Sequence, residues 1–403
     1  MSELTIGEVY RAQMVLKDVA RHPKIIGPTT LSDSCRIYLK PENLQHTCSF
    51  KLRGAYYKIS QLSDEEKKRG VIACSAGNHA QGVALGATHN GIKSLICLPA
   101  GAPISKIEAT KRLGAEVCLV PGVYDDAYAK ALELKEKHGY TFVHPFDDPL
   151  VIAGQGTIGL EILEEMPDEE AIVVPVGGGG LISGVAFAVK TLRPDIKVYG
   201  VQAEGAPSMV RSLADSERLH LDSVSTIANG HHDGLYIGHL LENTFALCRK
   251  YVDEIVTVSD DEIAAAILAL LEKQKLVAEG AGATAVAAAM FGHLPVEGKK
   301  IVCLVSGGNI DVNILNRIIN RGLAKTGRLC QLELAVQDKP GTLSSVLKIV
   351  ADEGGNILGV NHERVAAAAD INSCMLHLEL ETLNDDHIAR IRRSLEDAGF
   401  QVL

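Results

Sequence analysis

Residues 171–184 read AIVVPVGGGGLISG, and this stretch decides the fold of the 403-residue chain. Its first six residues, Ala171 to Val176, form an apolar run without polar alternation, which is typical of a strand buried on both faces. Four glycines follow, and the stretch from Leu181 to Leu192 then has helical character. A strand, a turn and a helix in this order predict a parallel β-α-β unit.

The same alternation of short apolar runs and helical stretches extends in both directions from the glycines. It predicts an α/β fold with a doubly wound parallel sheet. A surface helix is expected before it, because Thr5-x-x-Glu8 has the pattern of a capping box. The further strand predictions are Val71 to Cys74, Ser94 to Leu98, Val117 to Val120, Val198 to Val201 and Ile301 to Val305, and the further helix predictions are Ile104 to Leu113, Tyr124 to His138 and Asp260 to Lys275.

A different pattern begins near residue 325. The order of its segments is βαββαβ, which is typical of a small ferredoxin-like module. We therefore expect a boundary at 322–328, with one domain over residues 1–325 and a second over 326–403. The segments are a strand at Arg328 to Val336, a helix at Thr342 to Asp352, strands at Ile357 to Val365 and Ile371 to Glu381, a helix at Asp385 to Ala398 and a last strand at Phe400 to Leu403.

Composition excludes several classes of protein. The 40 basic and 50 acidic residues leave a net charge of −10, and with no long basic run and few aromatics the chain is not expected to bind nucleic acid. Nine cysteines are scattered singly without zinc-site spacing, which predicts free thiols and no metal site. Without a signal-like start or an apolar window of ~18 residues, we expect a soluble cytoplasmic protein with no membrane contact.

Two segments carry polar residues where a loop opens a helix. In Thr47 to Ala55, Lys51 precedes a helix, and the local pattern alone favours a solvated lysine, because a catalytic one needs a desolvating pocket. In Cys74 to Gly82, Ser75, Asn78 and His79 exceed what helix capping requires. Such a turn suits a carboxylate or a phosphate.

The glycine run itself predicts a phosphate site, because backbone N–H groups without neighbouring Cβ atoms can close on an anion at a helix start. A dinucleotide fingerprint is the competing interpretation, since Glu204 ends the next strand. Ser183 stands where the third glycine would be, so a single phosphate fits better. Ser306 either caps a helix or belongs to this site, and His231-His232-Asp233 is more typical of a loop than of a metal site.

Together these segments resemble the fold-type II pyridoxal phosphate enzymes, which are tryptophan synthase β-like, and within them the threonine ammonia-lyases with a carboxy-terminal ACT domain. The resemblance covers essentially the whole chain. It implies a two-lobed catalytic domain over residues 1–325, with a smaller lobe at about 50–150, and a regulatory ACT domain over 326–403. The matching motifs are Lys40 to Gln45, Ser49 to Ala55, Ser75 to His79, His144 to Asp148, Gly154 to Thr157, Gly177 to Gly180, Glu279 to Ala283 and Ser306 to Asn309.

The resemblance also implies pyridoxal 5′-phosphate as the cofactor and a role for each site residue. Lys51 is then the catalytic residue, which bonds the cofactor and later takes the α-proton of the substrate. Phe50 packs beside the pyridine ring, Asn78 bonds the ring hydroxyl, and Ser306 faces the ring nitrogen. The phosphate is held by Gly177, Gly178, Gly179, Gly180 and Leu181, and the substrate by Ser75, Ala76, Gly77, Asn78 and His79; no metal ligand is implied.

The implied reaction turns L-threonine into 2-oxobutanoate and ammonia, and L-serine into pyruvate, by loss of the α-proton and the β-hydroxyl. A serine racemase is one alternative, but racemases on this scaffold typically place a serine, their second acid and base, where Ala76 stands. Another β-elimination or β-replacement enzyme, or a catalytically impaired amino-acid-binding relative, is also compatible with the motifs.

Three places depart from the family pattern. Cys48 stands where a glycine is usual, and it would strain the backbone beside Lys51 if φ is positive there. The amino-terminal Thr-Pro-Leu reads His22-Pro23-Lys24, and 229–234 is more polar than usual. In the last module, Asp338 to Leu343 and Gly354 to Ile357 match effector loops, which implies a small amino-acid effector and a homo-oligomer, dimer or tetramer; a dimerisation module without a ligand is the alternative.

Overall fold

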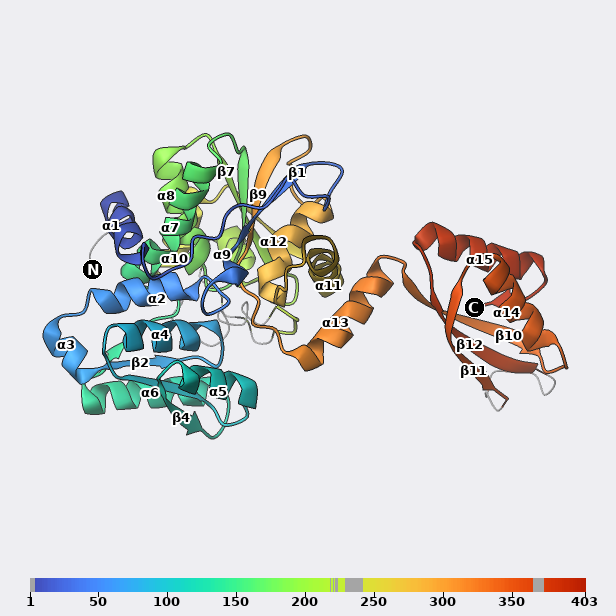
Figure 1. Cartoon of the computed structure of the whole chain (residues 1–403), viewed down its shortest axis with the longest axis horizontal. Coiled ribbons are helices and arrows are strands. Elements are labelled where there is room, and N and C mark those ends of the chain that lie inside the picture. Colours follow the sequence, from blue (N-terminus) through green and yellow to red (C-terminus); the bar gives the residue numbers. More distant parts are fainter. Residues whose placement is uncertain (1–3, 218, 220, 222–223, 229–241, 365–372) are drawn as a thin grey trace. The chain divides into compact units, whose positions relative to one another are not determined.

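The structure is a computed structural model, and it describes the chain except for residues 1–3, 218, 220, 222–223, 229–241 and 365–372. The chain divides into two compact units, residues 1–311 and 312–403 (Figure 1). Each unit is built around its own sheets and cores. The predicted boundary at 322–328 overlaps the end of the first helix of the second unit, and the division of function at residue 325 stays a prediction.

The larger sheet of the first unit has the strand order β1-β9-β6-β7-β8, and all neighbouring pairs are parallel. The predictions for β6, β7 and β9 are confirmed. The sequence predicts neither β1 nor β8, because both are edge strands that carry polar or part-exposed residues. The bounds are β1 (Arg36–Pro41), β6 (Ala171–Pro175), β7 (Lys197–Ala203), β8 (Glu254–Val258) and β9 (Lys300–Val305).

Helices cover both faces of this sheet, as a doubly wound fold requires. Helices α7 (Pro149–Glu165) and α8 (Gly180–Leu192) pack together on one face, and α12 (Gly280–Met290) lies along β6 to β9 on the other (Figure 1). Helix α11 (Asp260–Ala269) is shorter than predicted, since the chain passes into a π-helical turn at Leu270–Gln274 and Lys275 then takes a positive φ.

The smaller sheet has the order β4-β3-β2-β5, again all parallel, and lies within the span 50–150 that the sequence assigns to a smaller lobe. Its strands are β2 (Val71–Cys74), β3 (Ser94–Pro99), β4 (Glu116–Val120) and β5 (Thr141–Phe142). Helix α6 (Tyr124–His138) packs on one face, where Ala127 and Ala131 meet Ile72. Helix α4 (Asn78–His89) packs on the other, together with α2 (Lys51–Ser60).

Helix α2 also crosses α7, and a pair of glycines sets the closeness of that crossing. A Cβ on Gly54 would lie 2.6 Å from the carbonyl oxygen of Val151, and one on Gly154 would lie 2.6 Å from the Cα of Gly54. Neither side chain fits, because real Cβ atoms do not approach backbone atoms so closely. The glycine of the Gly154 to Thr157 motif therefore fixes where α2 lies, and with it where Lys51 lies.

The second unit begins with α13 (Val312–Lys325) and then follows the predicted βαββαβ order. Its antiparallel sheet has the order β11-β12-β10-β13, and both following helices contribute to one core with the inward residues of β10 and β12. The bounds are β10 (Leu329–Gln337), α14 (Thr342–Asp352), β11 (Asn356–Glu363), β12 (Ser373–Glu381), α15 (Asp385–Asp397) and β13 (Gln401–Val402).

The predicted capping box at the first helix is half formed. The Thr5 hydroxyl accepts from the Glu8 N–H at 3.2 Å, but the Glu8 carboxylate accepts from Tyr57 Oη and Arg11 instead of returning to Thr5. A tertiary partner on α2 therefore replaces the local one. The remaining helices are α1 (Ile6–Leu16), the 3₁₀ turn η1 (Glu42–Leu44), α3 (Asp64–Arg69), α5 (Ile104–Arg112), α9 (Ser208–Asp215) and α10 (Glu242–Tyr251).

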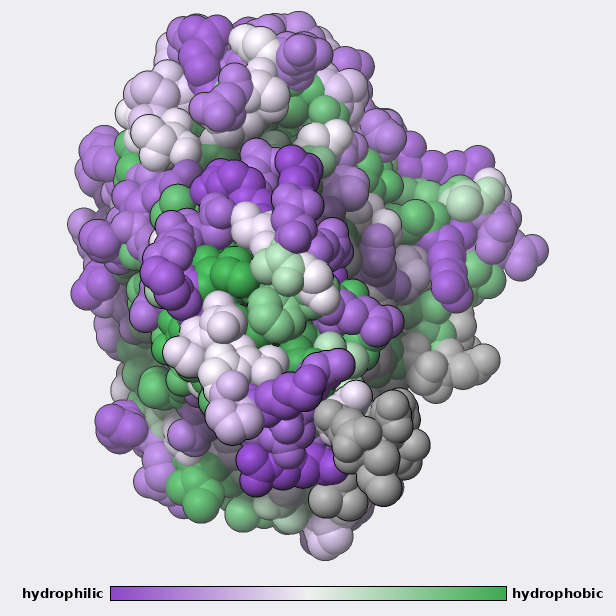
Figure 2. Space-filling model, turned by 90° about the vertical axis from the view of Figure 1, so that its right-hand side faces the viewer, coloured by the Kyte–Doolittle hydropathy of each residue, from purple (hydrophilic) through white to green (hydrophobic). Residues whose placement is uncertain are grey.

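Hydrophilic side chains cover most of the face drawn in Figure 2, with apolar side chains in small groups between them. Among the described residues, no helix combines the length and the apolar character that a membrane crossing needs.

Candidate active site

A cavity of about 310 Å³ lies in the first unit, at the carboxyl ends of strands from both of its sheets. Such ends, where the loops lead into helices, are the usual ligand sites of open α/β folds. All of the predicted site residues line it. They are Phe50, Lys51, Ser75, Ala76, Gly77, Asn78, His79, Gly177, Gly178, Gly179, Gly180, Leu181 and Ser306.

Lys51 opens α2 and reaches into this cavity. Its Nζ donates to the carbonyl oxygen of Pro145 at 2.9 Å. It also lies 5.4 Å from the ring centroid of Phe50 and 5.8 Å from that of Phe146. The amine is thus held between a carbonyl and two aromatic rings, which is the part-desolvated pocket that the local sequence could not show.

The backbone before Lys51 is tied to the last strand of the larger sheet. Ser49 forms an isolated antiparallel bridge with Gly307, and the Phe50 N–H donates to the Ser306 carbonyl oxygen at 3.1 Å. These two bonds place Ser306 beside the lysine, although the two residues are far apart in sequence. Ser306 itself is only 3% exposed.

Cys48, in the turn before this bridge, has φ +53°. The sequence predicts backbone strain at Cys48 if its φ is positive, because an L residue in the left-handed region is disfavoured relative to glycine. The turn persists because the Cys48 N–H donates to Gln45 at 2.9 Å and its carbonyl oxygen accepts from the Gly308 N–H at 2.9 Å. The strain is therefore located three residues before Lys51.

The four glycines Gly177 to Gly180 follow β6 and lead into α8, as predicted. Gly179 has φ +88°, and no side chain of the described residues caps the helix start. A Cβ on Gly178 would lie 2.6 Å from the Phe146 ring, and one on Gly180 would lie 2.7 Å from the Phe146 carbonyl oxygen. The glycines thus let the backbone close against Phe146 and leave the first N–H groups of α8 directed at the cavity.

The loop after β2 contributes a second helix start. The Gly77 N–H donates to the Ser75 hydroxyl at 3.1 Å, and a Cβ on Gly77 would meet nothing within 4 Å, so the loop is open here. The Asn78 amide is held from both ends, because its Nδ2 donates to Glu279 Oε1 and its Oδ1 accepts from Asn309 Nδ2, each at 2.6 Å. One N–H of that amide nitrogen remains to donate to a ligand.

Two histidines near Lys51 are neutral, the buried His79 and the part-buried His144. Burial first, and then the charge of Lys51, lower the pKa of His79 to about 3. Burial likewise lowers the pKa of His144 to about 4. His79 Nε2 donates to the Val143 carbonyl oxygen at 2.8 Å, so its Nδ1 bears a lone pair, and this atom has no partner among the described residues. His79 can therefore accept a hydrogen bond but does not bring a charge to the cavity.

These residues fit pyridoxal phosphate, the cofactor that the family resemblance implies. A buried helix start whose N–H groups lack a cap suits a phosphate, since the helix dipole also favours an anion there. Lys51 supplies the amine that a pyridoxal aldehyde bonds, and the Phe50 ring offers it an aromatic face. Of the lining residues, Lys51 and Lys106 are the cations and Glu279 the carboxylate, so the cavity accepts an anionic ligand in an acidic protein.

Other residues of the matching motifs lie beside the cavity and build its support. Arg53, fully buried, binds Glu42 through Nε and Nη2, each at 2.8 Å, and Glu161 through Nη1 at 2.6 Å and Nη2 at 2.9 Å. Lys40 Nζ binds the same Glu161 at 2.8 Å. Burial works to raise the pKa of Glu161, but Arg53 and Lys40 outweigh it and bring this pKa to about 2. The network is thus ionised and joins β1, α2 and α7.

Sequence reasoning gave no role to several residues that line the cavity. Lys106 and Tyr124 were not singled out at all, whereas Phe146, Glu279 and Asn309 were quoted only as parts of the matching motifs. Tyr124 Oη donates to the Cys74 carbonyl oxygen at 3.2 Å and so holds the strand end before Ser75. No local signal marks these residues, because each reaches the cavity from a distant segment. The departures at 229–234, and the His231-His232-Asp233 triplet, lie outside the described residues.

Known proteins that are similar to this chain are pyridoxal-phosphate dependent enzymes. The family described as pyridoxal-phosphate dependent enzyme matches residues 24–307. The chain is 51% identical over 401 residues to an L-threonine ammonia-lyase of Thermotoga maritima, with 99% of each protein covered. The processed form of threonine deaminase isoform 2 from Solanum lycopersicum is similar in structure, with a TM-score of 0.73, 40% identity, and coverage of 78% of this chain and 88% of that one.

Maize serine racemase is similar as well, with a TM-score of 0.73, 33% identity, and coverage of 80% of this chain and 99% of that one. Proteins named for two different activities thus share this fold. The reaction of this chain has to be argued from its own cavity.

Proposed function

The chain belongs to the pyridoxal-phosphate dependent enzymes and, within them, to the threonine ammonia-lyases, and from this premise we propose that its cavity converts L-threonine to 2-oxobutanoate and ammonia. The observation that carries the proposal is the position of Lys51. Its amine lies in one cavity with the uncapped, glycine-lined start of α8 and the polar start of α4. An amine, an anion site and a set of fixed polar groups are what this chemistry requires.

Each group has a distinct task in the proposed site. The N–H groups from Gly177 to Leu181 hold the cofactor phosphate, and Phe50 packs on its ring. Asn78 bonds the ring hydroxyl through its remaining N–H, and the two contacts to Glu279 and Asn309 keep its amide oriented. Ser306 faces the ring nitrogen as a neutral partner.

The loop from Ser75 to His79 binds the substrate carboxylate. The Ser75 hydroxyl and the N–H groups at the start of α4 are the donors for it. The His79 ring makes no hydrogen bond to that carboxylate, because its Nε2 donates to Val143 and its Nδ1 carries only a lone pair, so His79 contributes through its backbone N–H. The carboxylate is thus bound by neutral groups.

Bound pyridoxal phosphate supplies an electron sink joined to the substrate nitrogen, which weakens the bond between Cα and its hydrogen. Lys51 Nζ takes that proton, since it is the amine within the cavity whose position α2 and the Ser306 contact fix. The α-proton and the β-hydroxyl together leave as one water. One water then enters as the nitrogen departs as ammonia, so that threonine yields 2-oxobutanoate and serine would yield pyruvate.

The test is Lys51→Ala in the full chain loaded with pyridoxal phosphate. We expect turnover of L-threonine to fall by more than about 10³-fold, because the group that moves the proton is gone, and the visible absorbance of the bound cofactor to shift. Lys58→Ala is the matched control, since Lys58 lies on the same helix and pairs with Asp148 instead. Retained oxoacid release in Lys51→Ala would contradict the proposal.

The racemase alternative makes a different prediction. Ala76 lines the cavity at the position where racemases on this scaffold typically have a serine, and a methyl group cannot donate a proton. L-serine recovered after partial turnover should therefore remain the L enantiomer, with pyruvate formed. D-serine among the products would favour the racemase. Unchanged substrate and an unperturbed cofactor spectrum would favour the impaired amino-acid-binding relative.

We propose further that residues 326–403, within the second unit, form an ACT domain that regulates the enzyme. Its βαββαβ order supports this, as does the left-handed glycine, Gly341 with φ +95°, that ends the Asp338 to Gly341 turn before α14. Isoleucine and valine should change the rate of the full chain, and removal of residues 326–403 should abolish that response while basal turnover remains. An unchanged response would leave a dimerisation module. Sedimentation would give the size of the expected homo-oligomer.

A further inference from the structure

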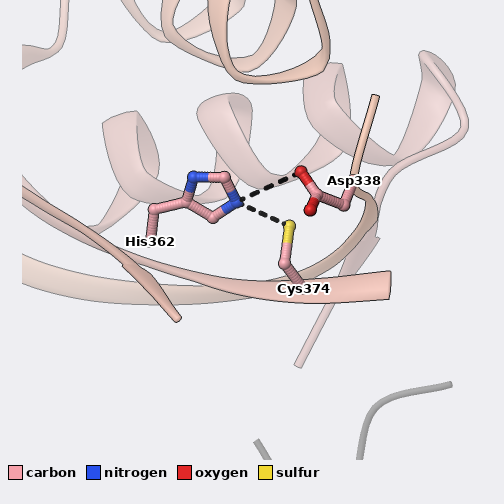
Figure 3. A group of neighbouring side chains, drawn as sticks. All are labelled: Asp338, His362 and Cys374. Atoms are coloured by element: carbon pink, nitrogen blue, oxygen red, sulfur yellow. Dashed lines mark hydrogen bonds and ion pairs between the residues drawn. The ribbon is translucent and has the colours of Figure 1, made fainter. Parts of the chain in front are cut away.

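Three side chains that sequence spacing does not connect meet at one end of the sheet in the second unit. They are Asp338, which follows β10, His362 on β11 and Cys374 on β12 (Figure 3). The sequence predicts no metal site, because the three residues are separated in the chain. The antiparallel ladder brings them together, since Cys374 pairs with Val336 and His362 pairs with Leu376.

The ligand atoms of the three residues lie within 4.8 Å of one another. His362 Nε2 lies 2.9 Å from Cys374 Sγ and 3.9 Å from Asp338 Oδ1. Figure 3 shows that the same ring nitrogen faces both the sulfur and the carboxylate. In a tetrahedral zinc site with bonds of ~2.0–2.3 Å, the ligand atoms are ~3.3–3.8 Å apart. Small side-chain rotations therefore suffice to bring the three atoms around one ion.

We propose that Asp338, His362 and Cys374 form a binding site for one first-row transition ion of the Zn²⁺ type. A thiolate, an imidazole and a carboxylate are the ligands that such ions take in proteins, whereas Mg²⁺ and Ca²⁺ prefer oxygen ligands alone. Three protein ligands leave a fourth position for water or another ligand. Binding replaces the hydrogen of the Cys374 thiol with a metal–sulfur bond, and one proton is released to solvent for each ion bound.

The surroundings suit this use. Arg364 holds both oxygens of Asp338, because its Nε binds Oδ2 at 2.9 Å and its Nη2 donates to Oδ1 at 3.5 Å, and Oδ1 also faces His362. Ligating carboxylates are commonly held in this way by a further hydrogen-bonding group. Cys374 is buried, the His362 side chain is 28% exposed and the Asp338 side chain is 37% exposed, so an ion can approach from the carboxylate side.

The ion would join the ends of three strands and the turn from Asp338 to Gly341 that leads into α14. The site therefore belongs to the second unit and is independent of the cavity around Lys51. It goes beyond the proposed lyase function, and its test does not depend on turnover.

The experiment titrates Co²⁺ into the full, cofactor-loaded chain after treatment with a chelator. We expect one equivalent to bind with a thiolate-to-cobalt charge-transfer band, and Zn²⁺ but not Mg²⁺ to displace it. Cys374→Ser should abolish the band, and His362→Asn should weaken Co²⁺ binding at least about tenfold. The same variants should lose the rise in melting temperature that Zn²⁺ gives the original chain.

Two matched variants serve as controls in the same sheet. Cys330→Ser removes a thiol from β10, and His377→Asn removes an imidazole from β12 that lies between Glu333 and Glu363. Both should keep the band. Absence of the band from the original chain, its persistence in Cys374→Ser, or unchanged affinity in His362→Asn would overturn the proposal. Far-ultraviolet circular dichroism establishes that each variant is folded. Because the His362 side chain is part-exposed and Cys374 is buried, His362→Asn is less disruptive to folding than Cys374→Ser.

Discussion

Lys51 and Arg53 stand two residues apart at the start of α2, yet they enter opposite environments. Lys51 reaches a cavity, where it donates to a backbone carbonyl and lies near two aromatic rings. Arg53 is fully buried between the carboxylates of Glu42 and Glu161. One cation is placed where a ligand can meet it, and the other is satisfied wholly by the protein.

The difference shows how one helix start can serve both chemistry and stability. A buried charge that lacks partners is costly, so Arg53 needs its carboxylates. A reacting amine needs the opposite, because a strong ion pair would hold it protonated. The buried network fixes α2 against α7 and β1, and Lys51, the first residue of α2, then points into the cavity.

Arg53→Met should have the largest effect on stability among the changes considered below. It removes the Arg53 guanidinium from buried Glu42 and leaves Glu161 with Lys40, and we expect the free energy of unfolding to fall by about 3–5 kcal/mol at pH 7. Arg193→Met is the control, since Arg193 pairs with Asp195 on the surface and its loss should cost less than about 1 kcal/mol. Denaturant unfolding measures both.

The pH dependence of the same pair sharpens this prediction. The pKa of Glu161 is about 2 in the folded state, below its usual value, so its stabilising contribution is complete above the usual value and is lost as the pH falls towards 2. The difference in the free energy of unfolding between the original chain and Arg53→Met should therefore become smaller as the pH is lowered below about 4.5. A constant difference would show that the network acts by packing alone.

Gly178→Ala tests the cavity around Lys51, as Arg53→Met tests the buried network. The new methyl group would lie 2.6 Å from the Phe146 ring, so the loop must shift where it is expected to hold the phosphate. A cost of about 1–3 kcal/mol corresponds to pyridoxal phosphate affinity that is roughly 5- to 150-fold weaker. Gly101→Ala, where a methyl group meets nothing within 4 Å, should leave the affinity unchanged. If Gly178→Ala and the original chain bind pyridoxal phosphate equally well, the four glycines Gly177 to Gly180 do not hold the cofactor.

Glu169→Gln tests whether a buried carboxylate stabilises the fold only when it has cationic partners, as Glu161 has in the Arg53 network. Glu169 is 3% exposed and neither carboxylate oxygen has a partner among the described residues. Burial raises its pKa to about 7. The folded state thus holds this proton to higher pH than the unfolded state, and stability falls as the pH rises from about 4.5 through 7.

The variant should therefore be more stable than the original chain by about 2–3 kcal/mol at pH 8 and by less than about 1 kcal/mol at pH 5. Glu170→Gln, at the exposed neighbouring position, should show no such dependence. If both variants behave alike, burial without partners is not the cause.

Cys48→Gly should have the smallest effect. Glycine adopts φ +53° without strain, although it also makes the unfolded chain more flexible, so we expect a gain of at most about 1 kcal/mol. Ser216→Gly, at φ +56° and outside the cavity lining, should give a similar gain. A change in threonine turnover in Cys48→Gly alone would show that the strain acts on Lys51. Equal turnover in all three proteins would make the strained turn only a structural feature.

Much of the fold follows from local patterns. The runs at Val71 to Cys74 and Ile301 to Val305 are continuous and apolar, and both are central strands. The edge strands β1 and β8 escape prediction because Arg36 and Lys40 interrupt the apolar run in β1, and β8 is short and mostly part-exposed. Local chemistry also misleads at Glu8, whose carboxylate turns to Tyr57 and not to Thr5.

The sequence by itself determined most of the order of strands and helices and the glycine-lined helix start, and its resemblance to a known family marked the candidate lysine. It could do so because burial on two faces and the bonds of a turn are properties of contiguous residues. The tertiary structure alone decided that Glu279 and Asn309 orient Asn78, that Arg53 is enclosed by two carboxylates, and that Asp338, His362 and Cys374 converge. These contacts join distant segments, and they depend on strand register and helix crossing, which no single stretch of sequence contains.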